Sequence, residues 1–209
     1  MSSTVVHAPK SKIGQPVWEI AELFPPQGLW SEDEYLALET NRLIEFDNGV
    51  LEILPMPNTL HQVIALVFAN LLLAFENGKL GTALCAPLRL KLPNGKYREP
   101  DVLFLLHEND DKLGLDYWTG ADLVVEIVSP GGHERDYIEK RSDYARTGIR
   151  EYWIVDPLTQ KVIVFKLDGK KYVEHGVFKK GSRATSALLI GFKVDVAALF
   201  AAGPKLPGK

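Results

Sequence analysis

Apolar stretches separated by turn-forming residues divide this chain into segments of strand length. Eight of these segments are predicted to be β-strands: Leu43–Phe46, Val50–Leu54, Thr82–Leu92, Tyr97–Leu105, Leu123–Val128, Glu151–Val155, Lys161–Lys166 and Lys171–Val177. Asn48-Gly49 separates the first two segments, and Asp168-Gly169 separates the last two. Because these turn residues tolerate positive φ, both pairs are predicted to be β-hairpins. Pro93-Asn94-Gly95 similarly turns the third segment back on the fourth.

Other segments have patterns that predict helices. Ser31 and Glu34 form a capping-box pattern that opens a short helix. Asn58–Glu76 is apolar around most of its surface and should be a long, largely buried helix, with Asn58 or Thr59 as its cap. His133–Thr147 is predicted as a further helix, and Val194–Phe200 as a small one. Because strands precede and follow the central helix, the pattern favours a mixed sheet with helices packed on it.

Length and apolar content predict one domain. The chain has 209 residues, of which 46% are hydrophobic, and this is enough for a single sizeable core. Residues 17–203 are expected to form the domain. Residues 1–16 have no periodicity and are expected to be a mobile tail, and residues 204–209 a C-terminal tail.

Charge and composition narrow the class of protein. The formal net charge is -3, so no global basic field attracts nucleic acid. A DNA-binding protein of this charge would need a local basic patch, or an acidic cleft that takes up Mg²⁺ before it meets phosphate. The longest apolar stretch, Val63–Phe75, is too short to span a bilayer, and the N-terminus lacks the apolar core of a signal peptide. With a single cysteine, Cys85, the chain is expected to be cytoplasmic and to have no membrane partner.

Glu126 is the most informative single residue. It lies alone within Leu123–Val128, which is typical of a strand buried on both faces. A buried carboxylate without a partner is costly, so Glu126 must either lose its charge or find a cation. A divalent metal ion, a lysine or an arginine would each compensate it, and each indicates a site.

A second carboxylate, Asp101, enters an apolar run directly after Pro100. Because proline cannot donate to a sheet ladder, Pro100 marks an edge, a bulge or a strand start. If the strands of Asp101 and Glu126 are neighbours, the two carboxylates converge, and a hard divalent cation such as Mg²⁺ would relieve their repulsion. The alternative is that Asp101 is a strand-end residue bonded to backbone amides.

Lys140 lies on the helix predicted to follow the strand of Glu126. Asp136, Lys140 and Tyr144 are spaced at i, i+4 and i+8 and share one face. Lys140 could pair with Glu126 and, near a metal ion, position or deprotonate an attacking water. By spacing alone, an exposed Asp136–Lys140 ion pair is the more common explanation. Tyr144 is expected to pack with its hydroxyl hydrogen-bonded.

Taken together, these segments resemble the Uma family of restriction-endonuclease-like proteins, within the PD-(D/E)xK nuclease superfamily. The resemblance covers roughly Ser31 to Leu199 and rests on the order and spacing of its motifs. They are Glu45 to Glu52, His61-Gln62, Arg98-Glu99-Pro100-Asp101-Val102, Asp122 to Pro130, the series Asp136, Lys140 and Tyr144, and Gly148 to Pro157.

The resemblance implies an α/β restriction-endonuclease-like fold, with a central mixed β-sheet flanked by helices and additional β-hairpins. It also implies a metal-dependent phosphodiesterase in which Asp101, Glu126 and the Ile127 carbonyl hold Mg²⁺, with Mn²⁺ as a substitute. Val128 stands where the superfamily often has its lysine. Lys140 matches the position of a lysine moved to the following helix, and would complete the catalytic set.

Three further residues are candidates near this site. His61 could contact phosphate or a metal-bound water, although a lone histidine is more often structural. Glu45 and Glu52 of the first hairpin could approach the site or face solvent, and Glu52 is the better candidate.

The expected substrate is nucleic acid, DNA in preference to RNA, and pairing of the second hairpin across a two-fold axis would give a homodimer. Two alternatives stay open. The chain could be a non-catalytic binding or assembly module that keeps the nuclease fold, or a metal-dependent hydrolase of another phosphoester.

Overall fold

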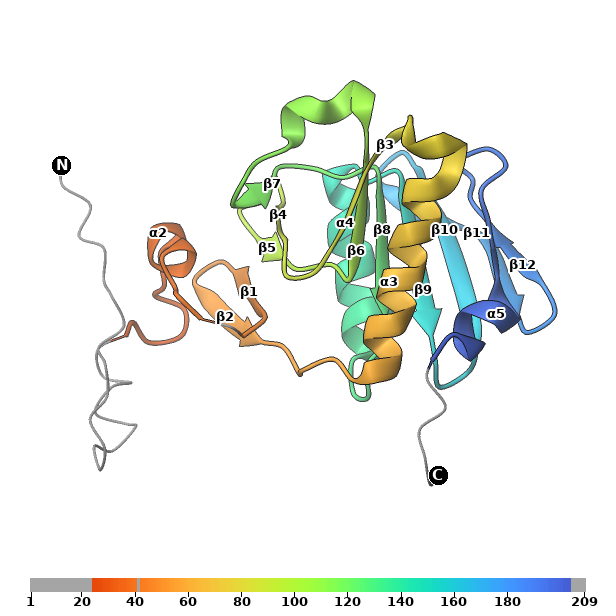
Figure 1. The fold of residues 1–209 in the computed structure, drawn as a ribbon. Coiled ribbons are helices and arrows are strands. Elements are labelled where there is room, and N and C mark those ends of the chain that lie inside the picture. The colour runs from red at the N-terminus through yellow and green to blue at the C-terminus, as the bar shows by residue number, and fades with distance from the viewer. Residues whose placement is uncertain (1–23, 41, 204–209) are drawn as a thin grey trace.

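The computed structural model describes residues 24–40 and 42–203 (Figure 1). They form a six-stranded sheet, a five-stranded sheet, a two-stranded ribbon and several helices. The tails predicted at residues 1–16 and 204–209 lie outside the described residues. None of the described helices is long and apolar enough to cross a membrane.

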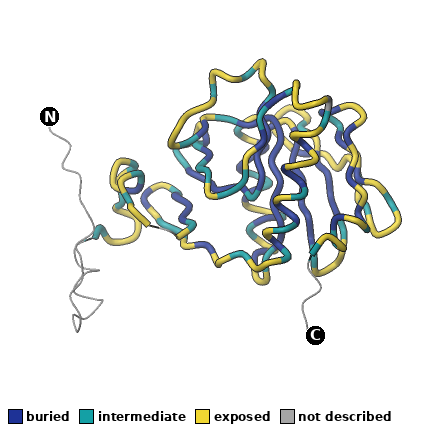
Figure 2. The backbone as a smooth tube through the Cα atoms, viewed as in Figure 1, coloured by how far each residue is buried: buried dark blue, intermediate teal, exposed yellow. Residues whose placement is uncertain are grey.

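The six-stranded sheet has the order β11-β10-β9-β8-β6-β3. Its strands are β3 (Gly81–Cys85), β6 (Val102–Leu106), β8 (Leu123–Ile127), β9 (Glu151–Asp156), β10 (Lys161–Asp168) and β11 (Lys171–Lys179). β8 and β9 are parallel and the other neighbours are antiparallel, so the predicted mixed sheet is confirmed. Every residue of β8 is buried, and the central strands are buried along their length (Figure 2).

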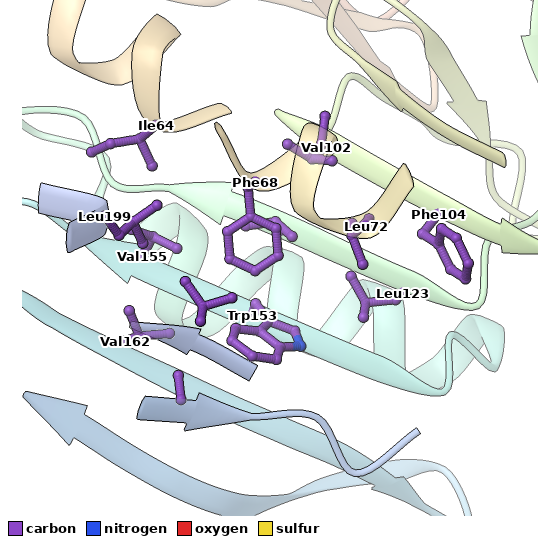
Figure 3. Close-up of a cluster of buried hydrophobic side chains, with 14 of the residues drawn as sticks. Ile64, Phe68, Leu72, Val102, Phe104, Leu123, Trp153, Val155, Val162 and Leu199 are labelled. Atoms are coloured by element: carbon purple, nitrogen blue, oxygen red, sulfur yellow. The ribbon is translucent and has the colours of Figure 1, made fainter. Parts of the chain in front are cut away.

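Helices cover both faces of this sheet (Figure 1). On one face lies α3 (Thr59–Ala74), capped by the predicted Asn58. Its apolar side chains pack on the sheet as Figure 3 shows, with Ile64, Phe68 and Leu72 meeting Val102, Phe104, Leu123 and Trp153. On the opposite face lie η3 (Arg135–Lys140), a π-helical turn, and α4 (Arg141–Thr147), which ends at Gly148 in the left-handed conformation. The sheet is therefore the middle layer of three.

The five-stranded sheet departs from the sequence prediction. Its order is β2-β1-β5-β4-β7. The bounds are β1 (Ile44–Asp47), β2 (Val50–Ile53), β4 (Arg89–Lys91), β5 (Tyr97–Arg98) and β7 (Tyr117–Trp118). The hairpin of β1 and β2 is confirmed, but the sequence does not predict β7 or a second sheet.

The second sheet exists because two predicted strands break. Thr82–Leu92 divides into β3 and β4, and Tyr97–Leu105 divides into β5 and β6, so each predicted strand contributes to both sheets. Pro87 and Pro100 lie at the two breaks, and a proline has no amide hydrogen with which to continue a ladder. The predicted pairing of the two segments is confirmed in both halves.

The remaining elements lie around these sheets. They are α2 (Glu32–Leu36), η1 (Phe75–Gly78), η2 (His107–Lys112), β12 (Arg183–Thr185), β13 (Lys193–Asp195) and α5 (Val196–Ala201). The capping box of Ser31 and Glu34 is confirmed at the start of α2. α5 confirms the small C-terminal helix, whereas β12 and β13 are absent from the prediction.

Candidate active site

Asp101 lies at the junction of the two sheets, immediately before β6. Because Val102 pairs with Val125, Asp101 stands beside the C-terminal end of β8. Its Oδ2 accepts a hydrogen bond from the Ile127 amide at 2.7 Å and lies 3.2 Å from His61 Nε2. Asp101 therefore makes the backbone contact expected of a strand-end residue, and it also faces a histidine from α3.

Glu126 points from β8 toward the helix layer that contains α4. Its side chain is almost fully buried, and Tyr144 donates a hydrogen bond to its Oε1 at 2.6 Å. Lys140 Nζ lies 3.0 Å from the same oxygen. A lysine thus supplies the cation that a carboxylate buried in this strand requires. The expected role of Tyr144, a packed residue with a bonded hydroxyl, is confirmed.

The π-helical turn η3 brings Lys140 inside the protein. Asp136 and Lys140 are both buried in this turn. The prediction of an exposed ion pair, which their spacing favours, is therefore wrong. A π-helical turn is wider than an α-helical one and is often found at functional sites. Lys140 Nζ contacts two carboxylates, because Glu45 Oε1 is 2.9 Å away and Glu126 Oε1 is 3.0 Å away.

Asp101 and Glu126 meet at one small cavity, which we call the catalytic cavity. Its volume is about 30 Å³, which is room for a water molecule or an ion but small for a nucleotide. Both carboxylates line it, and so do the other polar side chains of the site: His61, Glu99, Arg135, Asp136 and Lys140. Ile127 also lines it, beside Asp101.

Glu45 is the residue that the sequence analysis ranked too low. It is fully buried in β1, accepts a hydrogen bond from Arg98 at 2.9 Å, and also accepts one from the Glu99 amide at 3.2 Å. Glu52, the preferred candidate, has a 44% exposed side chain, which forms an ion pair with Arg135 at 2.9 Å. The sequence does contain a signal that Glu45 is buried. Glu45 stands between the apolar residues Ile44 and Phe46, just as Glu126 stands between apolar neighbours.

Glu99 is a second residue that the sequence analysis did not single out. It is buried, its Oε2 has no hydrogen-bond partner among the described residues, and Arg89 Nε lies 3.9 Å from its Oε1. Burial raises the pKa of Glu99 to about 7. A buried carboxylate oxygen without a partner is costly, and here it borders a cavity that could hold a cation.

The pKa values of the buried carboxylates depend on which of them lie close to a cation. Burial, together with the charges of Asp101 and Asp136, raises the pKa of Glu126 even though Lys140 opposes this. Burial alone would also raise the pKa of Glu45, but Lys140 and Arg98 lower it to about 2. Glu45 is therefore ionised throughout the physiological pH range, and its negative charge favours the protonated form of Lys140.

His61 is the second cation-forming group at the cavity. Burial lowers its pKa, but the hydrogen bonds with Asp101 and the Ile127 main chain outweigh burial and raise it overall. The ring's Nδ1 is buried, with no hydrogen-bond partner in the part of the chain that the structure describes. Protonated His61 and Lys140 thus neutralise Asp101 and Glu126 respectively.

The donor groups at the cavity suit a hard divalent ion. Within the part of the chain that the structure describes, no three carboxylate, histidine or cysteine side chains gather as a metal-binding group. Mg²⁺ does not need three, since it takes one or two carboxylates and fills its other positions with water and substrate oxygens. Asp101, Glu126 and the main chain of Ile127 provide such a set, and the unpartnered oxygen of Glu99 adds negative charge nearby.

In the absence of metal ions, the stability of the protein should fall as the pH rises from about 5 to about 7. Burial raises the pKa of Glu99 to about 7 and that of Asp136 to about 6, so the folded protein holds protons that the unfolded chain releases. Protonated His61 acts in the same direction above its ordinary pKa of 6.5. The urea midpoint, measured in EDTA across this range, should decrease.

The variant Glu99→Gln serves as the control for this pH dependence. It removes one of the titrating groups, so its midpoint should change less with pH than that of the wild type. A midpoint that increases from about pH 5 to about pH 7 would mean that the folded state does not retain these protons.

Comparisons with known families and with solved structures both gave matches to this chain. The family model described as "Uma2: Putative restriction endonuclease" matches residues 32–197. A solved structure described as "a putative nuclease belonging to DUF820 from Anabaena variabilis" matches with a TM-score of 0.68 and 19% sequence identity, over 85% of this chain and 99% of that chain. This likeness confirms the predicted fold. No curated protein matches the chain.

Proposed function

This chain belongs to the Uma2 family, and on that premise we propose that it is a divalent-metal-dependent endonuclease that hydrolyses phosphodiester bonds in nucleic acid, DNA in preference to RNA. The single observation that carries the proposal is the convergence of Asp101, Glu126 and Lys140 on one small, partly open cavity. Two strand-end carboxylates and a lysine make up a set that hydrolysis of a phosphodiester can use.

Asp101, Glu126 and the Ile127 carbonyl would hold Mg²⁺, or Mn²⁺ in its place. The bound ion would polarise the scissile phosphate and lower the pKa of an attacking water. Tyr144 fixes the orientation of Glu126 through its 2.6 Å hydrogen bond. With about 30 Å³ inside the cavity, the phosphate itself must lie at the mouth, near the partly exposed Arg135.

Lys140 would stabilise the negative charge that develops on the phosphate in the transition state. Its ammonium group lies between Glu45 and Glu126, at 2.9 and 3.0 Å. Glu45 would keep Lys140 charged and in place if Glu126 were to bind a metal ion. Glu45 is then a positioning residue, since it acts through the lysine.

His61 and Asp136 have accessory roles in this proposal. His61 lies 3.2 Å from Asp101 Oδ2 and would compete with a metal ion for that oxygen. Asp136 lines the cavity and lies 3.7 Å from Arg135, which it holds near the mouth. Cutting both strands of a duplex would need two such sites, which a homodimer would provide.

Incubation with supercoiled plasmid tests the proposed function. In Mg²⁺ or Mn²⁺ the wild-type protein should convert the plasmid to nicked and linear forms, and EDTA should stop the conversion. A matched incubation with structured RNA gives the preference between substrates. Failure to cleave either nucleic acid in either metal ion would contradict the proposal.

One observation favours a second candidate function, a non-catalytic module that keeps the fold. The protein's own cations already neutralise the two carboxylates, Lys140 for Glu126 and His61 for Asp101, so the fold does not need a metal ion to be stable. Titration calorimetry separates the two candidates. An absence of heat with Mg²⁺ and Mn²⁺, together with intact plasmid, would favour the module.

A further inference from the structure

The helix that brings Lys140 to the catalytic cavity turns other side chains toward a second cavity, of about 370 Å³. We call it the basic cavity. Among its lining residues are Tyr137, Arg141 and Arg146 from η3 and α4, and Lys170, Lys171 and Tyr172 from the far end of the β10–β11 hairpin. One helix thus separates the two cavities.

Four cations line the basic cavity, and no carboxylate does. Arg146, Lys170 and Lys171 are exposed, and Arg141 is half-buried. Across the described residues, none of the four forms an ion pair. Like charges gathered in a concave surface repel one another and raise the local concentration of anions, so an anionic ligand would stabilise the cluster. The cluster is notable because the chain as a whole carries a net charge of -3.

Arg141 is already held in a fixed orientation. Its guanidinium lies 4.4 Å from the centroid of the Phe165 ring, and its Nη2 donates a hydrogen bond to the Tyr172 carbonyl at 3.5 Å. A guanidinium with this restraint loses less conformational freedom when it binds a phosphate, whose oxygens fit its planar donors.

Tyr137 connects the basic cavity with the strand ends at the catalytic cavity. Its hydroxyl donates a hydrogen bond to Asp156 at 3.1 Å, and Asp156 ends β9 beside the end of β8. Two more basic side chains flank its ring, with Lys161 Nζ at 5.4 Å from the centroid and His133 stacked at 3.9 Å. Basic groups are therefore also found around Tyr137, one of the residues that line the basic cavity.

We propose that the basic cavity binds backbone phosphates of a nucleic-acid strand whose scissile phosphate lies at the catalytic cavity. This inference rests on the proposed function. It supplies the local basic patch that a nucleic-acid-binding protein of negative net charge requires. It also explains why the cations that line the basic cavity have no carboxylate partners among the described residues.

Binding of a labelled DNA duplex in EDTA, followed by fluorescence anisotropy, tests the inference without cleavage. The triple variant Arg146→Ala, Lys170→Ala, Lys171→Ala should bind at least about tenfold more weakly than the wild type. The slope of log affinity against log salt should decrease by about 3, since each phosphate contact contributes about 0.9. Arg141 is left unchanged because it packs on Phe165.

The matched control removes three exposed cations at the opposite end of β11, with Lys179→Ala, Lys180→Ala and Arg183→Ala. It should keep the wild-type salt slope. Equal affinity and slope in the cavity and control variants would overturn the proposal, as would a wild-type protein that does not bind DNA. A changed molar mass in light scattering with unchanged DNA affinity would also overturn it, because the cavity would then join two copies of the chain.

The outcomes also distinguish this proposal from the proposed function. If the cavity variant loses DNA binding and the wild type never cuts plasmid, the basic cavity is supported and the nuclease activity is contradicted. If the wild type cuts plasmid and the cavity variant binds DNA as well as the wild type does, only the basic cavity is contradicted.

Discussion

Asp101→Asn and Glu126→Gln should each lower the rate of plasmid cleavage by about 1000-fold, because each removes a charge proposed to hold the metal ion. A metal ion supplies several kcal/mol to the transition state, and about 4 kcal/mol corresponds to about 1000-fold in rate. Both substitutions preserve side-chain size, and asparagine can still accept the hydrogen bond from the Ile127 amide. Nicking rates and Mg²⁺ titration calorimetry measure the two effects separately.

Asp122→Asn provides a matched control for the loss of a buried carboxylate. Asp122 directly precedes the N-terminal end of β8, whereas Glu126 lies near the C-terminal end. The Asp122 side chain accepts hydrogen bonds from the Leu106 amide at 2.9 Å and from Asn109. This variant should be less stable than the wild type but retain metal binding and cleavage. If cleavage persists in Asp101→Asn and in Glu126→Gln, neither residue belongs to the catalytic site.

Lys140→Met should lower the free energy of unfolding by about 3–5 kcal/mol, which is the usual cost of removing one partner from a buried ion pair. Methionine fills a similar volume but leaves the buried Glu45 and Glu126 without their shared cation. Urea unfolding in EDTA near pH 7 measures this loss. A loss below about 1 kcal/mol would mean that Lys140 does not neutralise the two carboxylates.

The contribution of Glu45 follows from the same measurement. Adding Glu45→Gln to Lys140→Met should restore less stability than adding Glu126→Gln does, because Arg98 still pairs with Glu45 whereas Glu126 has lost its cation. Glu52→Gln is the matched control on the same hairpin, since Glu52 pairs with Glu45 across the strands but has a largely solvated side chain. Alone, it should change the stability by no more than about 1 kcal/mol.

Features specified by neighbouring residues were predicted well from the sequence. Asn48-Gly49 and Asp168-Gly169 fix their hairpins through the backbone conformations that they accept, and Asn58 fixes the start of α3 through its own side chain. The breaks at Pro87 and Pro100 were missed as sheet boundaries. A proline indicates where a ladder stops, but it does not indicate which sheet the next residues join.

The sequence by itself determined that Glu126 lies in a strand buried on both faces and needs a cation. This followed from local apolar pattern and from the cost of burying charge, both of which are properties of a short segment. Only the tertiary structure decided that the cation is Lys140, that the lysine lies within the protein, and that Glu45 is its second partner. The physical reason is that these ion pairs join residues from a hairpin, a strand and a helix, and their distances depend on how three elements pack.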